Sequence, residues 1–254
     1  MPDSAPKAII IGAGRGRRLM PLTEDTPKCY AEIGGRRIVD WAALALREAG
    51  LRDIVFIGGY QIDRIRADYP DFSFRQNDDW PNNNILASLF YAEDAMENGF
   101  ICSYADILYR PSIVERLLAS PHDITLAVDT DWRLRYSGRS QHPEDDAEKL
   151  LVDGDRVIAI RRAIPSDQAH GEYIGLARFT ATGAQVLRDH YHRARVNANG
   201  GAFREAPAFA KAYLIHLFQD MLEAGVPIHK VDTAGDYFEI DTTEDYNLAQ
   251  EFWR

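Results

Sequence analysis

The residues best suited to chemistry form a glycine- and arginine-rich loop directly after the first apolar run. Residues 12–23 read GAGRGRRLMPLT, and Pro27-Lys28 follows. Glycines between a strand and a helix let backbone N–H groups approach phosphate oxygens, and arginine forks suit bidentate phosphate contacts. We therefore expect a polyphosphate here, and the alternative is a glycine-rich turn with solvated arginines. The candidate residues are Gly12, Ala13, Gly14, Arg15, Gly16, Arg17, Arg18 and Lys28.

Two common phosphate loops are excluded by single residues. A dinucleotide fingerprint would need glycine at position 17, where Arg17 stands, and Pro21 interrupts the loop before any helix. A Walker loop would close with Gly-Lys-Ser/Thr, which is missing. A nicotinamide dehydrogenase is therefore disfavoured.

Two aspartates each follow a strand-like segment. Asp106 comes after the apolar run at residues 100–103, and Asp241 ends the segment 237–241. Ligands of open α/β sheets bind beyond the carboxyl ends of the strands, so we expect both carboxylates in one crevice. Mg²⁺ prefers such hard oxygen ligands beside a triphosphate. The alternative is that each aspartate caps a helix or turn.

A polar run at residues 82–89, NNNILASL, precedes a predicted helix. Asn84 is either the N-cap of that helix or, with Ser88, a reader of the hydrogen-bonding edge of a pyrimidine. Residue chemistry does not separate cytosine from uracil.

These motifs together resemble a known superfamily. Gly14-x-Gly16-x-Arg18-Leu19-x-Pro21-Leu22-Thr23 with Pro27-Lys28, then Tyr104-Ala-Asp106, then Glu239-Ile-Asp241 with Asp245-Tyr246 are similar to the signatures of nucleotidyltransferases of the sugar-nucleotide pyrophosphorylase type. The chain looks most like the phosphocholine and aminoethylphosphonate cytidylyltransferases. Its Gly12-Ala13-Gly14 departs from the usual Ala-Ala-Gly by one small residue.

The resemblance implies a role for each matching residue. Arg18 and Lys28 are implied to be catalytic, and Asp106 and Asp241 to bind Mg²⁺. The implied nucleotide-binding residues are Gly12, Ala13, Gly14, Arg15, Gly16, Gln76, Asn84 and Ser88. The implied acceptor-binding residues are Asp129, Trp132, Lys149, Glu172 and Tyr173. Trp132 and Tyr136 form either an aromatic wall for an ammonium group or a pair of half-buried side chains beside a loop.

The implied reaction is the transfer of CMP from CTP to the phosphate or phosphonate oxygen of a small acceptor, with release of pyrophosphate. Phosphocholine, phosphoethanolamine and aminoethylphosphonate all fit this description. The alternatives are a sugar-1-phosphate nucleotidyltransferase that uses UTP or dTTP and a non-catalytic nucleotide-sensing module. The resemblance allows a homo-oligomer, since members of the superfamily often self-associate, but the sequence itself does not indicate an oligomeric state.

The elements around these motifs alternate between strand and helix. We predict strands at 7–11, 53–57, 72–75, 100–103, 124–128, 156–160 and 173–179, and helices at 38–49, around 86–92 and at 206–224. Residues 139–146 are predicted to be an exposed loop and 193–204 a flexible connection. Repeated βαβ units imply a mostly parallel, mixed sheet in a single Rossmann-like, doubly wound α/β domain spanning 1–254, of the nucleotide-diphospho-sugar transferase type. Residues 1–120 would bind nucleotide, 121–235 the acceptor, and 236–254 would bring the second metal ligand.

The composition and net charge of the chain disfavour several classes of protein. The chain has 254 residues, 46% hydrophobic, and a formal net charge of −10, which disfavours a general nucleic-acid or anionic-membrane binder. Cys29 and Cys102 are too few for a disulfide framework and are expected to be buried thiols. No apolar run approaches the ~20 residues of a membrane span, and the N-terminus lacks a signal-peptide pattern. We expect a soluble, cytoplasmic protein.

Overall fold

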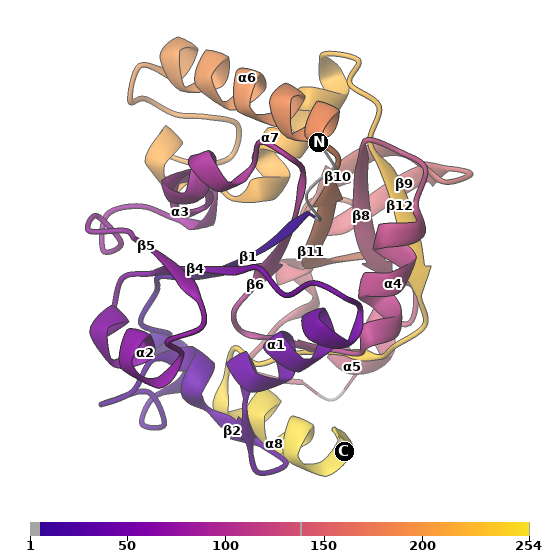
Figure 1. Ribbon diagram of the computed structural model, residues 1–254. Coiled ribbons are helices and arrows are strands. Elements are labelled where there is room, and N and C mark those ends of the chain that lie inside the picture. Colours follow the sequence, from indigo (N-terminus) through magenta and orange to yellow (C-terminus); the bar gives the residue numbers. More distant parts are fainter. Residues whose placement is uncertain (1–5, 138, 254) are drawn as a thin grey trace.

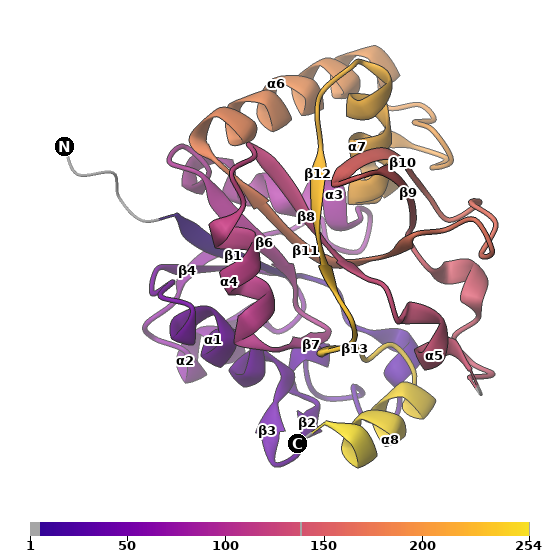
Figure 2. The same cartoon turned by 90° about the vertical axis from the view of Figure 1, so that its right-hand side faces the viewer.

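The alternating side chains of β1 (Lys7–Gly12) join two hydrophobic cores on opposite faces of a central sheet. Ile9 and Ile11 pack into one core, and Ala8 and Ile10 into the other, because successive side chains of a strand point to opposite faces. Helices therefore cover both faces, and Figures 1 and 2 show the sheet between them. The computed structural model describes residues 6–137 and 139–253, and the first five residues, on which the signal-peptide prediction partly rests, lie outside them.

Within the described residues, the central sheet has nine strands in the order β5-β4-β1-β6-β11-β8-β12-β10-β9. Strands β5, β4, β1 and β6 run parallel, and β11 is antiparallel to β6, to β8 and, at its start, to β9. This is the mixed sheet that the sequence predicts, with its parallel half at the N-terminal side of the chain. The further strands are β4 (Ile54–Gly58), β5 (Ser73–Gln76), β6 (Phe100–Tyr104), β8 (Ile124–Asp129), β9 (Lys149–Asp153), β10 (Arg156–Arg161), β11 (Gly171–Phe179) and β12 (His229–Thr233).

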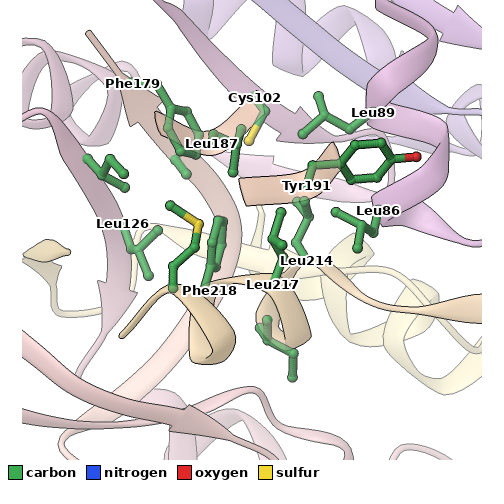
Figure 3. Close-up of a cluster of buried hydrophobic side chains, with 14 of the residues drawn as sticks. Leu86, Leu89, Cys102, Leu126, Phe179, Leu187, Tyr191, Leu214, Leu217 and Phe218 are labelled. Atoms are coloured by element: carbon green, nitrogen blue, oxygen red, sulfur yellow. The ribbon is translucent and has the colours of Figure 1, made fainter. Parts of the chain in front are cut away.

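Each face of the sheet has its own set of helices. One face carries α3 (Ile85–Leu89), α6 (Ala181–Ala198) and α7 (Leu214–Glu223), and the other carries α1 (Ile38–Glu48), α2 (Ile62–Asp68) and α4 (Pro111–Ala119). Figure 3 shows the first core, in which Tyr191 of α6 and Phe218 of α7 lie over Cys102 of β6. Cys29 and Cys102 are buried free thiols, as predicted. No helix among residues 6–137 and 139–253 is long and apolar enough to span a membrane.

The C-terminal segment returns to the start of the sheet through a small ladder. Strand β13 (Tyr237–Glu239) pairs antiparallel with β7 (Ile107–Tyr109), and the N–H of Ile240 donates to the carbonyl of Asp106 at 2.9 Å. This pairing brings Asp241 beside Asp106 although 134 positions separate them. The remaining elements are β2 (Glu32–Ile33), β3 (Arg36–Arg37), α5 (Trp132–Tyr136), α8 (Thr243–Phe252) and five 3₁₀ turns at Arg17–Leu19, Lys28–Tyr30, Phe90–Ala95, Glu144–Asp146 and Phe209–Lys211.

Two predictions about the second half are wrong in their bounds. The helix expected over 206–224 begins only at Leu214, because a β-bridge between Phe203 and Ala206 and a 3₁₀ turn occupy the preceding residues. The connection expected at 193–204 is helical up to Ala198, where Asn199 ends α6 in the left-handed conformation.

The loop at 139–146 is largely exposed, as its polarity predicts, but two of its side chains are directed into the protein. Arg139 and His142 are both buried, and both bind the fully buried carboxylate of Asp245 at 3.1–3.2 Å. These two side chains are therefore internal partners of α8, whereas Ser140, Gln141, Glu144 and Asp145 are exposed.

Candidate active site

A cavity of about 550 Å³ opens beyond the carboxyl ends of β1 and β6, within the roughly 300–1,000 Å³ typical of small-ligand sites. It gathers residues that are far apart in the sequence. The predicted site residues that line it are Gly12, Ala13, Gly14, Gly16, Arg17, Arg18, Lys28, Asn84, Ser88, Asp106, Glu172, Tyr173 and Asp241.

The glycine loop is shaped for close approach. Gly16 has φ +71°, and a Cβ at this position would lie 2.7 Å from Cβ of Lys28, so only glycine fits against the lysine stem. The hydroxyl of Thr23 donates to the carbonyl of Gly16 at 2.8 Å and closes the loop. Above Gly14 the space is open. The N–H groups of Gly14 and Gly16 have no partner among the described residues, which leaves them free to donate to an anion.

Two cations already hold the two aspartates together. The ammonium of Lys28 donates to Asp106 at 2.7 Å and also to Asp241, and the guanidinium of Arg18 donates to Asp241. Burial opposes the charge of Lys28, but Asp106 and Asp241 outweigh it and raise the pKa of the ammonium. Burial likewise opposes the ionisation of Asp241, yet Lys28 and Arg18 hold its pKa at about 2. Lys28 and Asp241 are therefore both charged at neutral pH.

This arrangement fits a divalent cation held by Asp106 and Asp241. A single ammonium reaches oxygens of both carboxylates, so one cation of similar reach can do the same when Lys28 turns to an incoming phosphate. A second group, His142, Glu239 and Asp241, also places ligand atoms within 4.8 Å of one another. Burial, followed by repulsion from Asp241 and Asp106, raises the pKa of Glu239 well above its ordinary value. The aspartate pair is thus the better oxygen site for Mg²⁺, which stays a prediction.

At the nucleoside end, Asn84 and Ser88 line the cavity but are partly engaged. Asn84 is the N-cap of α3: its side-chain oxygen accepts from the N–H of Ile85 at 2.8 Å. Ser88 accepts from the amide of Asn77 at 2.8 Å. The capping alternative for Asn84 is confirmed, and reading of a base by this pair stays a prediction. Trp80 and Asn83 also line the cavity; sequence reasoning missed both because nothing but polarity marks this loop.

Two predicted nucleotide-binding residues lie outside the cavity lining. Arg15 donates to the carbonyl of Glu24 at 3.2 Å and lies over the ring of Tyr60. Gln76 donates to Asp78 at 2.6 Å. Their side chains contact neighbouring protein groups instead of lining the cavity.

Three predicted acceptor residues are also outside the lining. Asp129 is fully buried, accepts from the N–H groups of Asp131 and Gly235, and contacts Arg135. Trp132 is 2% exposed, and the ammonium of Lys149 lies 5.9 Å from the centre of its ring. The expected aromatic wall is therefore covered by the protein's own cation.

The predicted acceptor residues that do line the cavity lie on β11. Glu172 accepts from the hydroxyl of Tyr136 at 2.6 Å, and burial raises the pKa of this carboxyl. Next to it, Tyr173 contacts the ring of Tyr104 edge-on at 6.1 Å. The strand thus brings one of the predicted acidic groups to the cavity wall.

The structure adds lining residues that were not singled out from the sequence, namely His142, Asp146, Glu148, Arg162, Tyr213 and Glu239. Glu148 and Glu239 stand inside the motifs, but their neighbours Lys149 and Asp241 drew the assignment. No motif in the sequence marks Arg162 or Tyr213. Arg162 follows β10 and Tyr213 precedes α7, and these two elements are far apart in the chain.

Comparison with known proteins agrees with this geometry. Residues 8–201 match the MobA-like NTP transferase domain. A CTP:phosphoglutamine cytidylyltransferase from Campylobacter jejuni is 30% identical over 254 aligned residues, covering 96% of this chain and 99% of the relative. A choline-phosphate cytidylyltransferase from Streptococcus pneumoniae is 29% identical over 135 residues, 51% of this chain and 58% of that protein. The solved inositol-1-phosphate CTP transferase from T. maritima matches with a TM-score of 0.74 at 23% identity, covers 98% of this chain and 97% of that one, and shows the fold alone.

Proposed function

The chain belongs to the MobA-like NTP transferase family and is a nucleotidyltransferase, and we propose that it transfers CMP from CTP to a phosphate or phosphonate oxygen of a small acceptor. The observation that carries this proposal is the convergence of Arg18, Lys28, Asp106 and Asp241 below the glycine loop. The use of CTP is supported by the cytidylyltransferase names of the relatives from C. jejuni and S. pneumoniae.

The reaction is an in-line displacement at the α-phosphorus of CTP. A bond forms between an acceptor oxygen and the α-phosphorus. The bond between the α-phosphorus and the oxygen that bridges to the β-phosphate breaks, and pyrophosphate leaves with the electron pair of that bond. A phosphate acceptor has a second pKa near 6, so it is largely ionised at neutral pH and needs no general base. The remaining task is to hold two anions within reach of each other.

The chain's own residues suit that task. The N–H groups of Gly14 and Gly16 can donate to the phosphates, and Arg18 and Lys28 place positive charge beside them. When phosphate arrives, these cations exchange carboxylate partners for phosphate partners. Asp106 and Asp241 would then hold Mg²⁺, which supplies further neutralisation of the triphosphate when bound.

Pyrophosphate release tests the proposal. The protein is incubated with each of CTP, UTP, dTTP and ATP against phosphocholine, phosphoethanolamine, aminoethylphosphonate and phosphoglutamine, with and without Mg²⁺. We expect release with CTP, and a loss of at least about 100-fold in the variants Arg18→Ala, Asp106→Ala and Asp241→Ala. Release with UTP or dTTP alone, or undiminished release from all three variants, would contradict the assignment.

The controls separate chemistry from folding. Arg52→Ala and Asp53→Ala remove the same charges from exposed positions before β4 and should keep full activity. Circular dichroism spectra should match the wild type for every variant. A variant that loses its spectrum as well as its activity says nothing about the reaction and is replaced by the isosteric Asp→Asn change.

A further inference from the structure

One wall of the cavity carries charges that the transfer of CMP does not use. Glu148 directly precedes β9, Arg162 directly follows β10, and Tyr213 is the N-cap residue of α7. All three line the same cavity as the glycine loop. They come from the part of the chain expected to hold the acceptor, and they pair with one another rather than with Arg18 or Lys28.

The contact between Arg162 and Glu148 is incomplete. Nη2 of Arg162 lies 3.4 Å from Oε1 of Glu148, longer than the roughly 2.7–2.9 Å of a well-formed charge-assisted hydrogen bond. Nε of Arg162 is buried and has no hydrogen-bond partner among the described residues. The guanidinium plane lies over the ring of Tyr213, 4.3 Å from its centre, which fixes its position. Arg162 is therefore held in place with donors to spare.

Glu148 has unused capacity in the same place. The residue is 8% exposed, and Arg162 is the cation that it contacts among the described residues. Tyr104 also lines the cavity; burial and then the charge of Glu148 raise the pKa of its phenol, whose hydroxyl has no hydrogen-bond partner among the described residues. Buried polar groups without partners destabilise a site unless a ligand satisfies them.

We propose that Arg162 and Glu148 form a subsite for an acceptor head group that carries both a carboxylate and an ammonium, as an amino acid does. This inference rests on the proposed function and specifies its acceptor class. The free donors of Arg162 suit a carboxylate, and the carboxylate of Glu148 suits an ammonium on the adjacent carbon. A zwitterion satisfies both residues at once and leaves the net charge of the wall unchanged.

Other acceptor groups fit this wall less well. A phosphate dianion beside Arg162 would also lie beside the carboxylate of Glu148 and be repelled by it. A quaternary ammonium such as choline's is bound by open aromatic faces, but Arg162 covers the ring of Tyr213 and would repel a second cation.

Calorimetric binding tests the subsite without requiring turnover. The acceptors are titrated into protein saturated with CTP in the presence of EDTA. O-phospho-L-serine and phosphoethanolamine differ only in the carboxylate, as do O-phospho-L-homoserine and 3-aminopropyl phosphate at greater length. We expect the carboxylate member of at least one pair to bind about 10- to 100-fold more tightly, and Arg162→Gln to abolish that preference.

The contribution of Glu148 is tested with the variant Glu148→Gln. 3-Phosphooxypropanoate is phosphoserine without its ammonium, so its binding should fall in Arg162→Gln and hold in Glu148→Gln. Arg161→Gln is the matched control, because the neighbouring Arg161 points to Glu223 on the surface, 2.8 Å away, and its loss should change no affinity.

Several results would overturn the subsite. These are equal wild-type affinity within both pairs, no binding of any zwitterion, or an equal loss for every acceptor in Arg162→Gln, which would mean that Arg162 holds the phosphate. The proposed function is judged separately by wild-type pyrophosphate release from CTP. Turnover of phosphocholine or phosphoethanolamine with no preference for a carboxylate would keep that function and reject this subsite.

Discussion

Buried carboxylates of the cavity differ in charge because their cation partners differ. Asp241 contacts both Lys28 and Arg18, and despite burial its pKa falls to about 2. Glu148 has Arg162 as its cation at a longer distance, and burial raises its pKa to about 7. The same chain thus holds one carboxyl firmly ionised at the phosphate end and another half protonated at the opposite wall.

Glu148 should therefore make stability depend on pH. Its folded pKa of about 7 lies above its ordinary 4.5, so the folded state binds the proton more tightly than the unfolded state. The ionised form destabilises the fold above pH 7, and the effect vanishes below pH 4.5. We predict that Glu148→Gln raises the free energy of unfolding by up to about 3 kcal/mol at pH 8 and by little at pH 4.5.

Urea unfolding of both proteins at pH 4.5, 6 and 8 measures this difference. The groups that act on Glu148 are Arg162, which lowers its pKa, and Glu172 and Asp106, which raise it. Glu115→Gln on the exposed face of α4 is the control and should shift stability equally little at each pH. A pH-independent effect of Glu148→Gln would show that Glu148 does not titrate in this range.

At the scale of elements, the turn between β13 and α8 holds the second aspartate in position. The carboxylate of Asp245 accepts from the N–H groups of Asp241 and Thr242 at 3.1 and 2.9 Å, while the hydroxyl of Thr242 accepts from the N–H of Asp245. Thr242, not Asp241, is the cap of α8, which leaves the side chain of Asp241 free to face Lys28. Nε of Arg139 lies 3.1 Å from Oδ1 of Asp245, and Nδ1 of His142 lies 3.2 Å from Oδ2.

Removal of Asp245 should therefore weaken both the fold and the site. We predict that Asp245→Ala lowers the free energy of unfolding by about 3–5 kcal/mol, because Arg139 loses its buried anion. It should also lower turnover beyond the fraction unfolded, because Asp241 loses its backbone support. Urea unfolding and pyrophosphate release measure the two effects. Glu251→Ala, exposed on the same helix, is expected to change neither; full activity per folded Asp245→Ala molecule would contradict the positioning role.

The elements also show how far sequence patterns reach. The parallel strands of the first half were predicted because they are uninterrupted apolar runs between glycines, as in β1 and β4. Strands β9 and β12 were missed because charged residues begin or interrupt them and their faces are only partly buried. The helix that corresponds to α7 was predicted to begin too early, because the apolar pattern also covers preceding residues that form a turn instead.

The candidate site divides in the same way. Residues in the short, dense motifs converge as expected, from Gly14 to Asp241. The predicted acceptor-binding residues converge only in part, because adjacent residues at the start of a strand face opposite sides of the sheet. Lys149 turns toward Trp132, while its neighbour Glu148 lines the cavity. Arg162 and Tyr213 meet only through the tertiary fold, so no local pattern marks them.

Across the whole molecule, the cavity is divided between two halves of one continuous sheet. The glycine loop, Lys28 and Asp106 come from around the parallel strands, and Glu148 and Arg162 from the strands beyond β11. The pairing of β11 with β6 joins these halves side by side. The residues that face the phosphates and the pair Glu148 and Arg162 are thus positioned by different strands. A substitution in one group should therefore leave the other group in place.

This separation gives a prediction about CTP binding alone. Gly16→Ala forces a Cβ into a residue at φ +71° and against Lys28, so the loop must shift. We expect wild type and Arg162→Gln to gain about 2.7 kcal/mol of stability at CTP 100-fold above its Kd. Gly16→Ala should bind CTP at least about tenfold more weakly and gain no more than about 1.4 kcal/mol at that concentration. Thermal unfolding and calorimetry with CTP measure both quantities.

Gly35→Ala is the matched control: Gly35 has φ +78° and open space around its Cβ, so the same backbone strain should lower stability there without changing CTP affinity. Equal loss of CTP binding in Gly16→Ala and Arg162→Gln would mean that the nucleotide spans both halves of the sheet.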